Sequence, residues 1–220
     1  PLRSIRDLVH AGTEKVIIDN VQIYEQVRYF AKEFVPFVYD RIVHYTAEQS
    51  LFDVHRVEDD LRDALKRRVD LKSGGYLIID QTEAMTTIDV NTGSFVGGRS
   101  LEDTVYKTNL EATHAIARQL RLRNLGGIII LDFIDMLEQQ HKDDILESLQ
   151  SQLVQDYATT KLTQVSERGL VEMTRKRTRE SLGQQLCEPC STCQGRGFVK
   201  TAETVCFEIF REIMRCDRTY

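Results

Sequence analysis

Apolar residues recur along the chain at helical or strand spacing, and the pattern predicts a mixed α/β protein. A hairpin is expected at residues 81–84, between two of the predicted strands listed below. A glycine-rich loop is expected from Thr92 to Ser100. Helices are predicted over Ser4–His10, Val21–Phe34, Arg56–Arg67, a long stretch after Ser100 that ends at Gly126–Gly127, Asp143–Val154 and the last 20 residues. Strands are predicted over Glu14–Asp19, Phe37–Tyr45, Tyr76–Asp80, Met85–Asn91, Ile128–Phe133 (apolar enough to be buried on both sides) and Lys161–Ser166.

Two of the predicted strands carry an aspartate where the pattern favours a hydrophobic residue, Asp89 and Asp132. A carboxylate in such a run is costly to bury unless it is paired, hydrogen-bonded or bound to a metal. Side chains alternate along a strand, so Asp89 and Asn91 project from one face. If the two strands are neighbours, the two carboxylates can share one Mg²⁺ ion. The alternative is structural: Asp89 caps a turn, and Asp132 is an N-cap or a salt-bridge partner. Asp135, which follows the strand, is a poorer candidate because it could simply cap the next segment.

Three cysteines are crowded into a short segment, and they favour a zinc site over a disulfide framework. Cys190 and Cys193 have C-x-x-C spacing and are followed by glycines, as in a zinc knuckle. Cys187 forms a second C-x-x-C with Cys190, so it is a possible third ligand. One knuckle supplies two of four ligands, so the others could come from another copy of the chain. The alternative is that these cysteines are buried free thiols.

The chain is acidic overall, with 29 Lys and Arg against 34 Asp and Glu and a net charge of −5. This balance argues against a protein that coats nucleic acid, although local basic patches are sufficient for binding. No apolar run approaches the ~20 residues of a transmembrane helix and no signal peptide opens the chain, so a cytoplasmic protein is expected. The segment from Glu172 to Ser181 is expected to be too charged for a core. Two basic patches stand out, with a solvated helix face as the alternative for each: Arg118, Arg121 and Arg123, and then Arg175, Lys176, Arg177 and Arg179.

The chain resembles the ribonuclease E/G family over nearly its whole length, most densely from 74 to 200. The segments that carry the resemblance include the two aspartate strands and the cysteine knuckle. The full set is Gly74–Tyr76, Asp80–Ala84, Ile88–Asn91, Thr108–Ala112, Ile116–Arg123, Leu125–Gly127, Asp132–Met136, Leu170–Arg177 and Cys190–Gly197.

The resemblance implies a fold and an activity. It implies an RNase H-like segment over 1–72, a DNase I-like mixed-sheet catalytic domain over 73–184, a zinc-knuckle link over 185–200 and a helical linker over 201–220 toward a missing C-terminal domain. It implies a Mg²⁺-dependent endoribonuclease that cuts single-stranded RNA, in rRNA and mRNA processing and decay, to 5′-phosphate and 3′-hydroxyl ends. Asp89 and Asp132 would hold Mg²⁺, with Asn91 orienting Asp89 or the water. Cys190 and Cys193 would contribute half of a zinc site shared within a homodimer or higher homo-oligomer.

The resemblance also implies what a longer family member contains. Members carry an oligonucleotide-binding barrel and a 5′-end sensor before this region, and the sequence here starts abruptly at Pro1. A catalytic core without these modules is therefore expected. Two rival functions remain: a non-catalytic zinc-linked dimerisation or RNA-binding module, which would not need Asp89, and a metal-dependent phosphatase.

Overall fold

The computed structural model describes the chain except for residues 1, 3–4, 7–8, 11, 94–100, 155, 164, 167–168 and 218–220. It contains two compact units, Pro1–Asp63 and Ala64–Tyr220, which are described separately below. The predicted helix over Ser4–His10 lies partly outside the described residues, and most of the predicted glycine-rich loop lies outside them.

The first unit packs a helix on a small parallel pair of strands. The strands are β1 (Val16–Ile18) and β2 (Ile42–His44), and the helix is α2 (Val21–Phe34), with the bounds that its periodicity predicts. Asn20 begins α2 by accepting the backbone N–H of Ile23 at 3.0 Å. The predicted strand over Phe37–Tyr45 is wrong in its first half, because Pro36 opens a 3₁₀ helix, η1 (Pro36–Arg41). Two short helices follow, α3 (Leu51–Val54) and α4 (Val57–Ala64).

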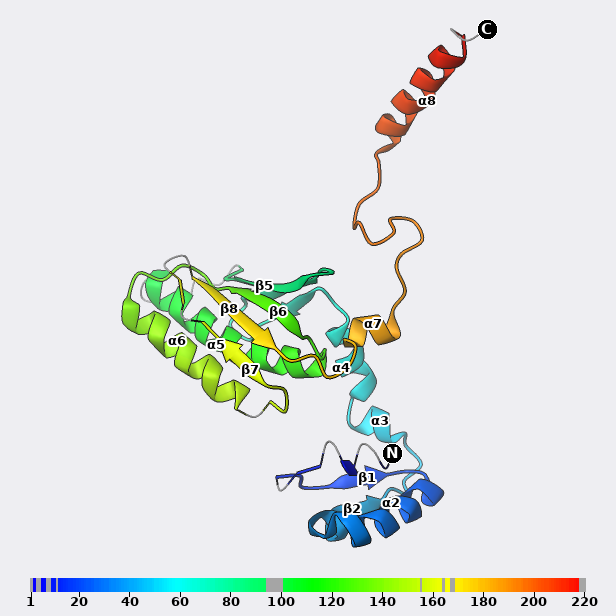
Figure 1. Ribbon diagram of the computed structural model, residues 1–220, viewed down its shortest axis with the longest axis vertical. Coiled ribbons are helices and arrows are strands. Elements are labelled where there is room, and N and C mark those ends of the chain that lie inside the picture. The colour runs from blue at the N-terminus through cyan, green and yellow to red at the C-terminus, as the bar shows by residue number, and fades with distance from the viewer. Residues whose placement is uncertain are drawn as a thin grey trace. The chain divides into compact units, whose positions relative to one another are not determined.

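The second unit is built on a six-stranded mixed sheet, which confirms the mixed α/β prediction (Figure 1). The strand order is β3-β4-β5-β6-β8-β7, and only β5 and β6 are parallel. The hairpin between β4 and β5 is confirmed. The strands are β3 (Arg68–Asp70), β4 (Tyr76–Gln81), β5 (Met85–Asn91), β6 (Gly127–Asp132), β7 (Thr160–Leu162) and β8 (Leu170–Arg175), and two long helices, α5 (Leu101–Leu122) and α6 (Gln139–Leu153), connect them.

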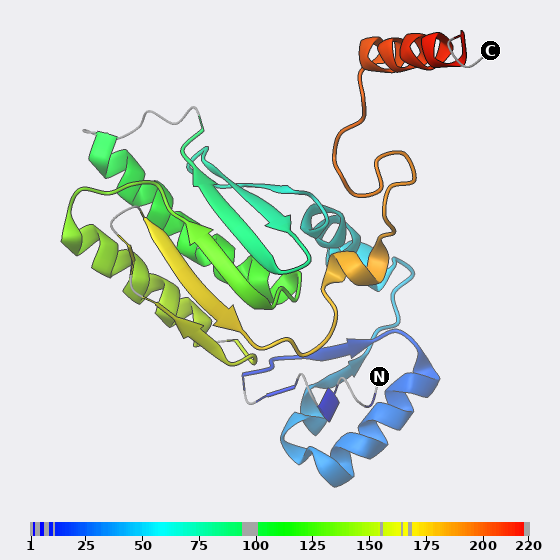
Figure 2. The same ribbon diagram turned by 45° about the horizontal axis from the view of Figure 1, so that its top comes forward.

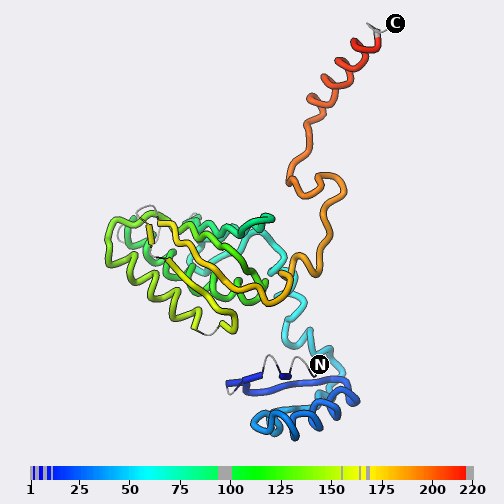
Figure 3. The backbone as a smooth tube through the Cα atoms, viewed as in Figure 1, coloured from blue at the N-terminus to red at the C-terminus, as the bar shows by residue number. Residues whose placement is uncertain are grey.

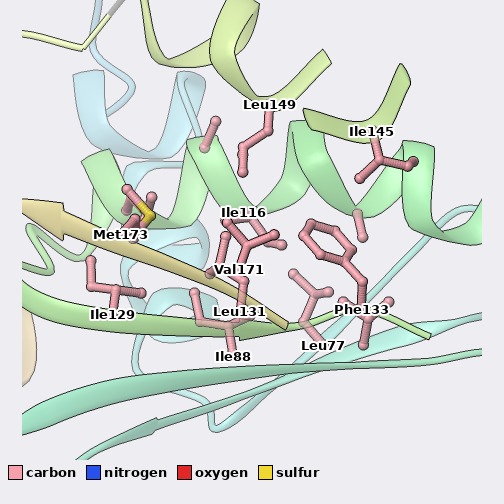
Figure 4. Close-up of a cluster of buried hydrophobic side chains, with 14 of the residues drawn as sticks. Leu77, Ile88, Ile116, Ile129, Leu131, Phe133, Ile145, Leu149, Val171 and Met173 are labelled. Carbon is pink, nitrogen blue, oxygen red and sulfur yellow. The ribbon is translucent and has the colours of Figure 1, made fainter. Parts of the chain in front are cut away.

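The two long helices cover one face of this sheet (Figures 1 and 2). Figure 4 shows Ile116 and Leu149 from the helices meeting Ile88 and Leu131 from the strands, all fully buried. Residues that alternate with these core positions lie on the opposite, solvent-facing side of the sheet. The prediction that the strand of Ile128 is buried on both sides is therefore wrong, since Ile128 is 49% exposed.

Strand β8 was not predicted, because its segment was expected to be too charged for a core. Its residues alternate between the two faces, so Val171, Met173 and Arg175 are buried while Glu172 and Thr174 are exposed. The charge of Arg175 is balanced by Asp156, which allows burial. The end of α5 also differs: the residue with a positive φ (48°) after the helix is Asn124, and Gly127 already belongs to β6.

The second unit begins before the catalytic domain that the resemblance implies. Strand β3 pairs with β4, so Arg68–Asp70 belong to the same sheet as β5 and β6. The RNase H-like and DNase I-like assignments stay predictions. After β8 the chain forms α7 (Leu182–Leu186) and then α8 (Ala202–Asp217), the helix predicted for the last 20 residues, and Figure 3 traces this path. None of the helices that the structure describes is long and apolar enough to cross a membrane.

Candidate metal centre

The two aspartates that the sequence singled out lie side by side. Asp89 near the end of β5 is the direct register partner of Asp132 at the end of β6. These strands are parallel because α5 returns the chain to the same end of the sheet, so the last residues of both strands meet at one edge. Neighbouring strands are about 4.8 Å apart, which brings two carboxylates within reach of one ion.

Both carboxylates lie on the open face of the sheet rather than in the core. Asp89 and Asp132 are exposed, while their strand neighbours Ile88 and Leu131 are buried under the helices. Because both residues reach solvent, the cost of burying a carboxylate is smaller here than the strand pattern implies. Within the described part of the chain neither aspartate forms an ion pair, so the salt-bridge alternative finds no support there. The expectation that Asp89 and Asn91 share a face is confirmed, since the Asn91 amide donates to the Asp89 carboxylate at 2.9 Å.

Negative charge accumulates at this edge. Partial burial raises the pKa of Asp132, and the nearby charges of Asp89 and Asp135 raise it further. The contributions of Asp89 and Asp135 to this rise reflect repulsion between their negative charges and an ionised Asp132. A bound cation would relieve this repulsion.

The donors present fit an ion that keeps part of its water shell. In the described residues no group of three or more histidine, cysteine, aspartate or glutamate side chains is arranged to hold a metal. Asp89 and Asp132 alone would supply two oxygen ligands. Mg²⁺ is commonly held in this way, by one or two carboxylates together with waters and substrate phosphate oxygens.

The backbone that follows Asp132 is fixed from two sides, and sequence reasoning did not identify the residues responsible. Gly169 adopts a positive φ of 76°, and any Cβ there would clash with the carbonyl oxygen of Phe133. Asn109 of α5 is fully buried and binds both backbone groups of Ile134: its amide donates to the carbonyl at 2.8 Å and its carbonyl accepts the N–H at 3.1 Å. One feature of the sequence could have identified Asn109: it is a polar amide on the apolar face of a predicted helix.

We expect Asn109→Leu to slow the RNA cleavage that the resemblance implies by more than its stability cost explains. The change leaves both backbone groups of Ile134 without their partner, which should cost about 1–3 kcal/mol and loosen the segment after Asp132. Turnover should fall roughly tenfold with little change in KM for RNA. Thr108→Val is the control, because the buried Thr108 hydroxyl donates only to the carbonyl of Thr104 within the same helix, at 2.9 Å. Equal turnover in the two variants at matched folded fraction would contradict this role.

The cysteine segment forms an exposed turn, so the alternative of buried thiols is wrong. Cys187 and Cys190 are exposed and Cys193 is partly exposed. Backbone N–H groups of Cys193 and Thr192 donate to the sulfur of Cys190 and lower its pKa, which favours the metal-binding thiolate. Gly195 and Gly197 have φ of 83° and 78°, which allows the chain to turn back on itself after Cys193. Cys187 instead ends α7, where its N–H donates to the carbonyl of Gly183.

The two predicted basic patches differ from a solvated helix face in different ways. In the first, Arg123 is buried, with bonds to Gln119 at 2.7 Å and to the carbonyl of Lys66 at 2.7 Å. In the second, Arg175 is buried and the following residues lie beyond the end of a strand rather than on a helix. The exposed cations of the second patch are Lys176, Arg177 and Arg179.

Comparison with known proteins agrees with the resemblance. The model of the ribonuclease E/G family matches residues 1–178. Ribonuclease G of Escherichia coli (strain K12) is 55% identical over 218 residues, which are 99% of this chain and 45% of that protein. Ribonuclease G of Haemophilus influenzae is 55% identical over 215 residues, 98% of this chain and 44% of the relative. The ribonuclease E/G-like chloroplastic protein of Arabidopsis thaliana is 37% identical over 216 residues, 97% of this chain and 22% of the relative.

The chain spans less than half the length of these relatives. The family match nevertheless covers most of the chain, including both aspartate strands and β8. Taken with the paired aspartates on β5 and β6, this match shows that the chain belongs to the ribonuclease E/G family.

Proposed function

We propose that this chain is a Mg²⁺-dependent endoribonuclease that cleaves single-stranded RNA. The observation that carries the proposal is the pairing of Asp89 with Asp132 across parallel strands, where the charges of Asp89 and Asp135 contribute to the raised pKa of Asp132. Relatives named ribonuclease G and ribonuclease E support the choice of RNA as substrate. Action on rRNA and mRNA, a cytoplasmic location and a homo-oligomeric assembly belong to the same proposal.

Asp89 and Asp132 would hold the ion, and Asn91 would fix the orientation of Asp89 through the hydrogen bond at 2.9 Å. When bound, Mg²⁺ supplies positive charge to the phosphate and lowers the pKa of a coordinated water. A water oxygen would form a bond to phosphorus and lose a proton, while the bond from phosphorus to the 3′ oxygen breaks. The 3′ oxygen gains a proton, so the products carry 5′-phosphate and 3′-hydroxyl ends.

One assay separates this proposal from its two rivals. The purified chain is incubated with internally labelled single-stranded RNA, in buffer with Mg²⁺ or without it, so that zinc stays on the protein. An endoribonuclease gives internal fragments that require Mg²⁺, whereas a phosphatase releases only terminal phosphate and a binding module leaves the RNA intact. Internal fragments at equal rates with and without the metal would contradict the proposed chemistry.

We also propose that Cys190 and Cys193 supply half of a zinc site shared between two chains. Support comes from the exposed C-x-x-C turn and from the lowered pKa of Cys190. Zinc in structural sites takes four ligands, and the part of the chain that the structure describes offers no cluster of three.

Metal analysis of the purified chain should therefore give about one zinc per two chains, because each zinc takes two sulfurs from each copy. Cys193→Ser should lose the zinc and weaken the dimer in analytical ultracentrifugation. Cys206→Ser is the matched control, since Cys206 is an exposed thiol on α8. A monomer that holds one zinc per chain would instead indicate a local site that includes Cys187.

A further inference from the structure

Two hollows at the end of β8 are lined by the second basic patch and share one residue, Arg177. The first, of about 600 Å³, has Gly127, Ile128, Lys161 and Lys176 in its wall. The second, of about 420 Å³, is lined by residues that include Asn124, Gly126 and Arg179. Both hollows have Arg177 in their wall, and together they are here called the basic groove. It lies at the start of β6, at the opposite end of that strand from Asp132.

Arg175, which lines the first hollow, is held by a buried ion pair. Arg175 and Asp156 form a pair with bonds of 2.7 and 2.9 Å, and their side chains are only 5% and 1% exposed. Arg175 also donates to the carbonyl of Leu125 at 2.7 Å, which holds the entry to β6 against β8. Arg175 is thus engaged in contacts within the protein, and the cations that can bind a ligand in the groove are its neighbours.

The position of Arg177 is set by glycines. Its Nε donates to the carbonyl of Gly126 at 3.1 Å, and a Cβ at Gly126 would come within 2.8 Å of its side chain. A Cβ at Gly127 would lie 3.1 Å from both Nε and Nη2. The two glycines therefore make room for the guanidinium. With Nε bonded to protein, the terminal nitrogens stay available for an anion.

The groove carries more positive charge than the protein neutralises. Lys161, Lys176, Arg177 and Arg179 are all exposed, and no described carboxylate forms an ion pair with any of them. Glu180 is the one acidic residue among the residues that line the two hollows. This excess occurs in a chain with a net charge of −5, so it is a local feature rather than a consequence of composition.

We propose that the basic groove binds backbone phosphates of the RNA several nucleotides from the bond that is cut. The proposal rests on the proposed function, because it takes Asp89 and Asp132 as the cleavage site. Gly127 and Asp132 are the two ends of β6, about 17 Å apart at the usual rise of a strand. That distance is too large for contacts to the scissile phosphate. Spaced cations along one groove fit a polyanionic chain better than they fit a single small anion.

Binding is measured with a 20-nucleotide RNA by fluorescence anisotropy in buffer without Mg²⁺, so that zinc stays bound and cleavage does not interfere. The variant is Lys161→Ala with Lys176→Ala. The control is Lys32→Ala with Lys107→Ala, two exposed lysines of α2 and α5 outside the groove. Two phosphate contacts should disappear, so the slope of log Kd against log salt should fall by about 1.4, and affinity at low salt should fall roughly tenfold. Arg177→Ala should act in the same direction.

Cleavage of long and short substrates gives an independent readout. The double variant should cleave the 20-nucleotide RNA more slowly and a four-nucleotide RNA at the rate of the unaltered chain, since a short substrate cannot reach the groove. Unchanged affinity and salt slope would overturn the groove proposal even if the RNA is cut. Loss of affinity in a chain that cuts no RNA would instead leave the groove standing and remove the proposed function.

Discussion

Asp132→Asn and Asp89→Asn are each expected to lower the rate of RNA cleavage by about a thousandfold or more while the protein stays folded. The two carboxylates are register partners at one edge of the sheet, and each substitution removes an anionic ligand of the proposed ion. Metal stabilisation of phosphoryl transfer is worth several kcal/mol, and each 1.4 kcal/mol corresponds to a factor of ten. Rates are measured under single-turnover conditions at saturating Mg²⁺.

Asp135→Asn is the matched control for these substitutions. Asp135 is an exposed aspartate close enough to raise the pKa of Asp132, but it lies beyond the end of β6 and outside the paired positions. Its replacement should change the rate far less than replacement of Asp132. Near-normal cleavage by Asp132→Asn would remove Asp132 from the proposed site, and a loss confined to Asp135→Asn would move the site to the following loop.

The largest stability effect is expected from Asp156→Asn. It leaves the buried Arg175 without the carboxylate that accepts two of its hydrogen bonds. Breaking a buried pair by removing one partner typically costs 3–5 kcal/mol. At roughly 2–4 °C per kcal/mol, the melting temperature should fall by about 10 °C. The exposed pair Arg67–Asp80 is the control, and Asp80→Asn should cost under about 1 kcal/mol.

The buried Arg175–Asp156 pair should also make the stability of the protein fall at low pH. Burial opposes ionisation of Asp156, but its hydrogen bonds from Arg175 and the backbone of Ala158 lower its pKa below the ordinary value. A lowered folded-state pKa stabilises the protein above the unfolded value of about 3.9, and that stability is lost as pH falls through the folded value. Denaturant midpoints measured from pH 6 downward should therefore converge for the unaltered chain and Asp156→Asn. A constant gap down to pH 2 would contradict this assignment.

Alternation of apolar and polar residues predicted the elements that carry the site. The pattern placed β5 with its observed bounds. The aspartates were predicted to share a site on the condition that their two strands are neighbours, and the pairing of β5 with β6 meets that condition. The pattern failed for β8 because a charged residue such as Arg175 is expected to be exposed unless its ion-pair partner Asp156 is known. That partner lies 19 residues away in sequence, beyond the reach of local periodicity.

The supporting residues of the site could not be predicted for a related reason. Asn109 matters because its amide faces the backbone of Ile134, and that contact depends on how α5 packs on the sheet. Gly169 matters because Phe133 approaches it closely, which the sequence around Gly169 does not indicate. Local spacing indicates which side chains a strand presents on each face. The contacts that position a loop depend instead on tertiary structure.

The most direct test of the proposed metal centre is ion binding in the absence of RNA. Mn²⁺, which suits the same oxygen ligands as Mg²⁺, is titrated into the chain and followed by electron paramagnetic resonance. Zinc is kept bound, so that sites at the cysteines do not contribute. We expect one Mn²⁺ per chain that is displaced by Mg²⁺ and is lost in the Asp89→Asn/Asp132→Asn double variant. Equal Mn²⁺ binding by the unaltered chain and the double variant would contradict a metal centre at the paired aspartates.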